Sequence, residues 1–137
     1  MGEEAVFPNH RELSVRRSAA GFDVPVHHMR GGTSTGVVLW TRFVPEGRPE
    51  REELVRRIMG LPLSGQVAQN RQTTGLGRGT PTSNKIFFAG LEATPAGPRL
   101  VSELAQAAAR TAAIDWSVNC GNMSAALQLW GIGRAHV

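Results

Sequence analysis

Three segments of the chain combine residues that could bind anions or move protons. Residues 29–34 read MRGGTS, residues 75–85 read GLGRGTPTSNK, and residues 119–122 read NCGN. Glycine lets a ligand come close to the backbone, and Ser, Thr and Asn side chains add hydrogen-bond donors, a combination that suits carboxylates or phosphates. Taken singly, each segment is also compatible with ordinary turns. The phosphate-binding pattern G-x-x-x-x-G-K-[ST] is excluded, because Lys85 does not follow such a pair of glycines and precedes Ile86.

Lys85 is the only lysine among fifteen basic residues, and the other fourteen are arginines. Either residue can supply a solvated positive charge, whereas an amine that must shed its proton cannot be replaced by a guanidinium, which stays charged. The bias is therefore compatible with a lysine that transfers protons. On the count alone, a surface lysine left by compositional drift is the simpler explanation, so the context of Lys85 has to decide.

Cys120 directly precedes a segment that we expect to form a buried helix. Unpaired amides and the dipole at a helix N-terminus stabilise a thiolate and attract anions. An inert buried cysteine is the commonest fate of a free thiol, and the polar neighbours Asn119 and Asn122 argue against it, so the sequence leaves both alternatives open. A single cysteine forms no internal disulfide, and with four histidines no zinc-ligand spacing can be assembled around it.

The overall composition predicts one globular domain. The chain has 137 residues, of which 41% are hydrophobic and 19% charged, and it lacks both a long apolar run and a secretory signal pattern. We therefore expect a cytoplasmic protein that does not enter a membrane. The net charge of +4 is spread over the whole chain, and aromatics make up only 6% with no tyrosine, which argues against nucleic acid as a partner.

The elements before the second segment follow from periodicity and capping signals. Residues 1–20 read as a loose leader. Residues 23–29 and 36–40 predict two strands flanking a tight glycine turn. Acidic residues after Pro49, apolar residues at helical spacing and a closing Gly60 predict a helix between these two positions.

The elements after this helix are a loop, a strand and two alanine-containing segments. Residues 60–84 are rich in small polar residues and predict a long loop, a length that usually signals function. Residues 86–88 predict a buried strand that ends by Gly90. The alanine-rich residues 103–113 favour a helix by propensity, and the almost wholly apolar residues 122–130 predict a buried helix.

The order of the three segments, MRGGTS, then GLGRGT with SNK, then DWSVNCGN, resembles the PrpF family, which contains 2-methylaconitate isomerase and is related to 4-oxalomesaconate tautomerase. The resemblance covers roughly residues 24–132. It implies an α+β fold similar to that of diaminopimelate epimerase: two similar domains, each a curved sheet wrapped around a central helix, with the active site between them. Residues 122–130 would be the central helix of the first domain, and residues 99–107 a strand despite their helical propensity.

The resemblance also implies a chemistry. Family members catalyse a 1,3-allylic proton shift in unsaturated di- or tricarboxylates without a cofactor or metal. Lys85 and Cys120 correspond to the catalytic pair, with Cys120 either a second acid/base or a positioning group. The residues implied in binding the substrate carboxylates are Arg30, Gly31, Gly32, Thr33, Ser34, Thr80, Ser83, Asn119, Gly121 and Asn122.

The chain departs from the family pattern at three places. Thr35 stands where family members commonly carry lysine, and Pro81 and Asn84 stand where they often carry serine. The chain is also much shorter, so we expect residues 21–137 to be a first domain truncated after its central helix, which would self-associate through the face left open. The alternative to an isomerase fragment is an inactive fragment that only binds polycarboxylates.

Overall fold

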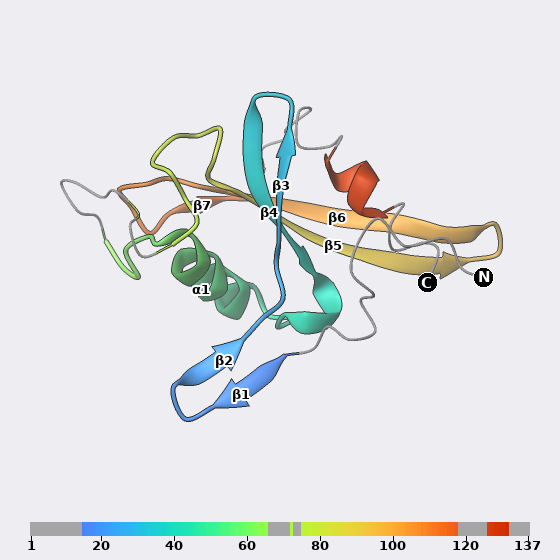
Figure 1. Ribbon diagram of the computed structural model, residues 1–137, viewed down its shortest axis with the longest axis horizontal. Helices are drawn as coiled ribbons and strands as arrows, with labels where there is room; N and C mark the ends of the chain where they lie inside the picture. Colours follow the sequence, from blue (N-terminus) through green and yellow to red (C-terminus); the bar gives the residue numbers. More distant parts are fainter. Residues whose placement is uncertain (1–14, 66–71, 73–74, 118–125, 132–137) are drawn as a thin grey trace.

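The computed structural model describes residues 15–65, 72, 75–117 and 126–131. Its centre is a five-stranded sheet in the order β3 (His27–Gly31), β4 (Ser34–Trp40), β5 (Lys85–Thr94), β6 (Gly97–Ala107) and β7 (Ile114–Asp115). Neighbouring strands are antiparallel except β4 and β5, which are parallel. A short 3-10 turn, η1 (Thr41–Phe43), and one helix, α1 (Arg48–Met59), connect the parallel pair. The fold is therefore mixed α+β (Figure 1).

A small hairpin precedes the sheet. Strand β1 (Arg16–Ser18) pairs with β2 (Gly21–Asp23) in a separate two-stranded sheet beside α1 (Figure 1). The expectation that residues 1–20 form a loose leader is wrong for β1, because its backbone is paired with β2. Residues 1–14 lie outside the described part of the chain.

Helix α1 agrees closely with the sequence prediction. Pro49 lies in its first turn, and Gly60 ends it in the left-handed conformation (φ 73°), which glycine adopts without steric cost. Two ion pairs have i,i+4 spacing: Glu53 with Arg57 is exposed, whereas Glu52 with Arg56 is part-buried, with Trp116 donating to Glu52 and Arg56 donating to the Ala112 carbonyl. Val55 and Met59 are fully buried on the side that faces the sheet.

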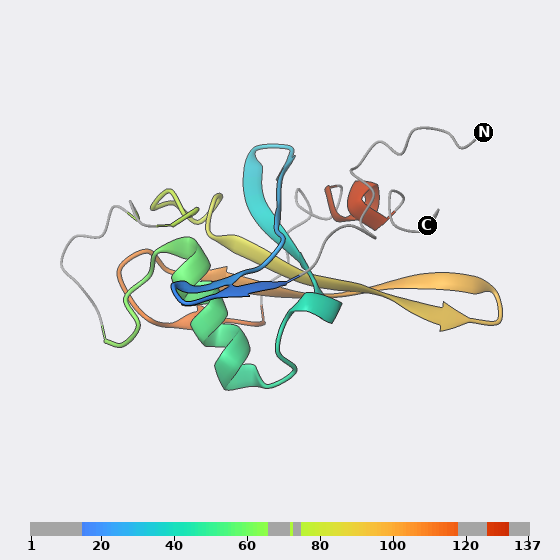
Figure 2. The same cartoon turned by 60° about the horizontal axis from the view of Figure 1, so that its bottom comes forward.

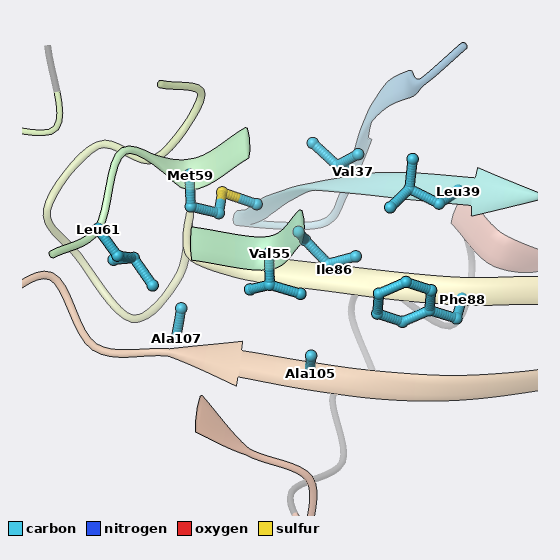
Figure 3. Packing of buried hydrophobic residues seen from close by; sticks show 9 residues of the cluster. All are labelled: Val37, Leu39, Val55, Met59, Leu61, Ile86, Phe88, Ala105 and Ala107. Carbon is cyan, nitrogen blue, oxygen red and sulfur yellow. The ribbon is translucent and has the colours of Figure 1, made fainter. Parts of the chain in front are cut away.

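Helix α1 covers one face of the sheet, and this face forms the first half of the core. Alternate residues of three neighbouring strands point toward the helix, as strand geometry requires. The buried residues of this cluster, shown together in Figure 3, are Val37, Leu39, Val55, Met59, Leu61, Ile86, Phe88, Ala105 and Ala107.

The opposite face of the sheet packs against residues 126–131, which are helical. Ala126, Leu127 and Trp130 are buried there, and the strand residues beneath them are Val38, Phe87, Ala89 and Leu104. Figure 2 shows α1 and residues 126–131 on opposite sides of the sheet. Leu129 is 49% exposed, so the predicted buried helix is covered by the sheet on one side and exposed at this position.

Strands β5 and β6 form one long hairpin that extends past both helices (Figure 1). The expected end of the strand by Gly90 is wrong, because β5 continues to Thr94 and Gly90 pairs with Val101 inside the ladder. The helical propensity of residues 103–113 is overridden, because Leu104, Ala105 and Ala107 are buried in strand β6 between two helix-covered faces. The family resemblance predicted this strand correctly.

Candidate active site

The first two glycine-containing segments meet at one edge of the sheet. Because β4 and β5 are parallel and Gly36 pairs with Lys85, both strands begin at this edge. The Thr35 N–H donates to the Thr82 carbonyl at 2.8 Å, which joins the β3–β4 turn to the loop before β5. Segments that are far apart in the sequence are thus brought into direct contact.

Lys85 is the first residue of β5 and is half-buried. It lies between Gly36 of β4 and Gln106 of β6, and its amine donates a hydrogen bond to Gln106 Oε1. Phe87, two residues along the strand, packs toward residues 126–131. Strand alternation therefore places Lys85 on that same face, together with Gln106.

Gln106 is a site residue that the sequence reasoning missed. Its side-chain nitrogen contacts three backbone carbonyl oxygens, those of Pro81 (3.2 Å), Asn84 (3.1 Å) and Ala107 (3.3 Å). The helical propensity of residues 103–113 concealed it, since only a hairpin places this residue opposite Lys85. The turn signal Pro95-Ala96-Gly97 was available, and it fixes the β5–β6 register that pairs them.

The residues before Lys85 form a compact turn that is stabilised by its own hydroxyl groups. The Ser83 N–H and hydroxyl both donate to the Thr80 carbonyl, at 3.0 and 3.1 Å, and the two side-chain oxygens lie 3.0 Å apart. Ser83 is buried and Thr80 is exposed. Of these two predicted ligand donors, Thr80 is thus the one that faces solvent.

The β3–β4 turn presents a second set of the predicted residues. Gly32 adopts a left-handed conformation (φ 56°) in the two-residue connection, with Thr33 exposed beside it. Gly31 and Ser34 are buried at the strand ends. Ser34 lies two residues before Gly36, and alternation therefore places it on the face of Lys85.

Arg30 is placed differently from the other predicted residues. Its neighbour Met29 packs toward residues 126–131, so strand alternation assigns Arg30 to the opposite face of the sheet. Its Nε donates to the Gly32 carbonyl at 3.0 Å, and the side chain is exposed. The structure therefore does not bring Arg30 onto the face that carries Lys85.

The third predicted segment is not described. Cys120, together with Asn119, Gly121 and Asn122, lies outside the described residues, between Ser117 and the helical residues 126–131.

The glycines at the start of the second segment contact helix α1. The Leu76 N–H donates to the Ile58 carbonyl at 2.7 Å and the Gly77 N–H to the Met59 carbonyl at 3.3 Å, so the loop satisfies carbonyls at the helix C-terminus. A Cβ added at Gly75 would lie 2.1 Å from the Gly60 nitrogen. The expectation that these glycines bring the backbone close to a ligand is thus wrong for Gly75 and Gly77, because they bring it close to α1.

Gln72 holds the same loop from inside. It is buried, and its side-chain nitrogen donates to the Met59 carbonyl and to Asn84 Oδ1, both at 2.9 Å. Its Oε1 accepts a hydrogen bond from the Gly79 N–H. One side chain thus connects helix α1, the middle of the loop and the residue before Lys85.

The described residues contain neither a cluster of metal ligands nor a helix that could span a membrane. Among the residues that the structure describes, no group of three or more His, Cys, Asp or Glu side chains is gathered that could hold a metal ion. Within the same residues, no helix has the length and apolar character needed to cross a membrane.

Comparison with known proteins identifies relatives over most of the chain. The model of the PrpF protein family matches residues 22–135. The chain is 32% identical over 119 residues to 2-methyl-aconitate isomerase of Cupriavidus necator and 30% identical over 114 residues to 3-methylitaconate isomerase of Eubacterium barkeri. Each match covers 83% of this chain and 28% of the relative, so the chain spans little more than a quarter of their length. A crystal structure of methylitaconate-delta-isomerase superimposes with a TM-score of 0.71 at 30% identity, again over 83% of this chain and 28% of the other.

Proposed function

Because this chain belongs to the PrpF family, we propose that it carries the lysine-bearing part of an isomerase site for unsaturated di- or tricarboxylates of the methylaconitate or methylitaconate class. The substrate class is taken from the names of the relatives, which are isomerases of 2-methylaconitate and 3-methylitaconate. Because the chain spans 28% of these relatives, the activity of a whole protein is part of the proposal.

The proposed reaction is a 1,3-allylic proton shift. The amine of Lys85 removes a proton from the carbon next to the conjugated acid, and the electron pair left behind spreads over the double bond and the carboxylate. A proton is then returned two carbons away, so the double bond moves and no atom is gained or lost. We propose Cys120 as the second proton carrier or as a group that positions the substrate.

The proposed substrate contacts come from all three glycine-containing segments. Thr33 and Thr80 are exposed at the sheet edge, where the two segments are joined by the Thr35–Thr82 hydrogen bond. Asn119, Gly121 and Asn122 would add donors from the third segment. Donors of this kind stabilise the enolate-like intermediate, in which negative charge builds up on the carboxylate.

One observation carries the proposal: the only lysine of the chain begins the strand at which the first two glycine-containing segments meet. Its amine donates to the neutral side-chain oxygen of Gln106, and among the described residues it forms no ion pair with a carboxylate. A surface lysine left by compositional drift has no reason to occupy this position.

The larger architecture is also part of the proposal. We infer a diaminopimelate epimerase-like arrangement in which residues 126–131 belong to the central helix and the sheet wraps around it. The packing of Ala126, Leu127 and Trp130 on the face of Lys85 supports this arrangement.

The activity test replaces Lys85 with arginine. Lys85→Arg keeps the positive charge and approximate reach but removes the amine that transfers the proton, so turnover of 2-methylaconitate, followed by its ultraviolet absorbance, should fall about 10²–10⁴-fold. Arg99→Lys is the matched control, because Arg99 lies in an exposed pair with Glu92 on the distal hairpin. Near-full activity of Lys85→Arg would exclude the proposed role. Polycarboxylate binding without turnover by the unaltered chain would instead favour the inactive binding fragment.

A further inference from the structure

The contacts of Gln106 differ from those of an ordinary strand residue. Its side-chain oxygen accepts from the amine of Lys85, while its side-chain nitrogen faces three carbonyl oxygens. We propose that Gln106 is a positioning residue that sets the location of the Lys85 amine and couples it to the turn at residues 80–83. The inference rests on the proposed function, in which Lys85 moves the proton.

The orientation of the Gln106 amide follows from its neighbours. Carbonyl oxygens only accept hydrogen bonds, so the NH₂ end of the amide must face Pro81, Asn84 and Ala107. The amide oxygen is thereby left facing Lys85, whose ammonium or amine can donate to it. The opposite amide orientation would place an oxygen against three oxygens and a donor against a donor.

This arrangement restricts a side chain that is otherwise flexible. A lysine side chain has four rotatable bonds. When its amine is already fixed in place, less conformational entropy has to be lost to reach the reacting geometry. The same amide holds the Pro81 and Asn84 carbonyls, one on each side of the buried Ser83. The lysine amine and the turn that precedes it are therefore held to strand β6 by one side chain.

Gln72 provides a matched comparison on the other face of the sheet. It also holds the loop before β5, through the side chain of Asn84 and the carbonyl of Met59, and neither of these two contacts involves Lys85. A purely structural role of Gln106, which would only tighten the loop, predicts similar consequences for Gln72 and Gln106 variants. A positioning role predicts a change at the lysine amine for Gln106 variants alone.

The first test follows the amine directly in the 137-residue chain. Because Lys85 is the only lysine, selective ¹⁵N-lysine labelling gives one side-chain Nζ signal, and acetylation by sulfo-N-hydroxysuccinimide acetate can be followed at one peptide. Gln106→Met keeps the length of the side chain and removes both polar atoms. It should shift the Nζ signal and accelerate acetylation about tenfold, the factor that loss of one hydrogen bond to a charged group produces. Gln72→Met should lower the stability and leave both readouts as in the unaltered chain.

A second variant separates the two ends of the amide. Gln106→Glu keeps an acceptor oxygen for Lys85 but cannot donate to the three carbonyls. It should therefore keep acetylation slow, whereas Gln106→Met should not. Equal acceleration by the Met, Glu and Gln72 variants would overturn the inference, because a loosened loop would then explain all three.

Turnover distinguishes this inference from the proposed function. Gln106→Met should lower kcat about tenfold and leave KM nearly unchanged, because it misplaces the base without removing a substrate contact. If Lys85→Arg abolishes activity while Gln106→Met retains full kcat, the inference fails and the proposed function stands. If Lys85→Arg instead retains near-full activity, the proposed function fails, while the Nζ signal and the acetylation rate still decide whether Gln106 sets the location of the amine.

Discussion

Gln72 and Asn84 form a side-chain hydrogen bond of 2.9 Å in the protein interior, where both residues are almost completely buried. Buried amides are stabilising only when their donors and acceptors are paired. The second contact of the Gln72 nitrogen, with the Met59 carbonyl, meets this requirement and also reaches helix α1. Asn84, the residue before Lys85, is thereby connected through Gln72 to helix α1, which covers the face of the sheet opposite to Lys85.

The loop that carries this bond should not tolerate a side chain at Gly75. A Cβ there would lie 2.1 Å from the Gly60 nitrogen and 2.3 Å from the Met59 carbonyl carbon. Both are backbone atoms, so relieving the clash requires a displacement of the main chain. Gly75→Ala should lower the free energy of unfolding by about 3 kcal/mol or more, at the upper end of overpacking effects. Urea unfolding followed by circular dichroism measures this change.

The control for this prediction is Gly65→Ala. Gly65 has a left-handed φ of 62° and open space around its Cβ position, so only the conformational cost of about 1–2 kcal/mol should appear. Equal losses in the two variants would contradict the close approach of the loop to α1.

The contacts of Trp116 should contribute more to the free energy of unfolding than the ion pair of Glu92 with Arg99, although that pair has the shorter distance. Its Nε1 donates to Glu52 at 3.0 Å, and the Arg48 guanidinium lies 3.8 Å from its ring centre. Trp116→Phe should cost about 1–2 kcal/mol, because it removes the hydrogen bond and weakens the cation–π contact. Glu92→Gln should cost less than about 0.5 kcal/mol despite its 2.6 Å contact with Arg99, because both side chains are more than half exposed. Thermal melts that reverse this order would contradict the ranking.

Asp115 should contribute a small stability that is lost in acid. The Ser117 hydroxyl, at 2.6 Å, and then the Ser117 N–H, at 2.8 Å, hold the pKa of the Asp115 carboxyl below its usual value. A group whose pKa is lower in the folded state stabilises the fold above the unfolded pKa of about 4, and this stability disappears as the pH falls through the folded pKa. Asp115→Asn and Ser117→Ala should both flatten the decline of stability below about pH 4 in urea titrations. An unchanged acid limb in both variants would show that the contact has no effect on folding.

Cys120 gives a test of the third segment, which lies outside the described residues. It is the only cysteine, so iodoacetamide labelling reports on one position. If Cys120 belongs to the proposed site, 2-methylaconitate at about ten times its dissociation constant should slow labelling about tenfold, because only the unliganded fraction reacts. Labelling that is slow and independent of the ligand would favour an inert buried thiol.

The parts of the fold that the sequence predicted best are those with strong local signals. Helix α1 has a proline in its first turn and a left-handed glycine after its last residue, and both follow from backbone sterics alone. The two-residue turn at Gly32 likewise needs a residue that accepts a positive φ. Such signals do not depend on what the element packs against.

The parts that sequence reasoning missed depend on distant partners. Ala105 and Ala107 have high helical propensity, but the long hairpin and its two covered faces make them strand residues. Gln106 could be assigned to the site only once its pairing with Lys85 was known. The role of Gly75 was misjudged for the same reason, because its partner is the end of α1.

The strand pairings on either side of Lys85 have different consequences for the order in which the site assembles. Strands β5 and β6 are joined by a tight turn. Lys85 therefore pairs with Gln106 as hydrogen bonding extends from this turn along a single hairpin. Its pairing with Gly36 requires closure of a much longer stretch of chain, which contains all of α1 and the loop that docks on it. Closing a longer loop costs more entropy, and non-local pairs form later in folding. We therefore expect Lys85 to pair with strand β6 before the β3–β4 turn packs beside it. The proposed base would then be in place during folding earlier than the turn that is proposed to bind substrate.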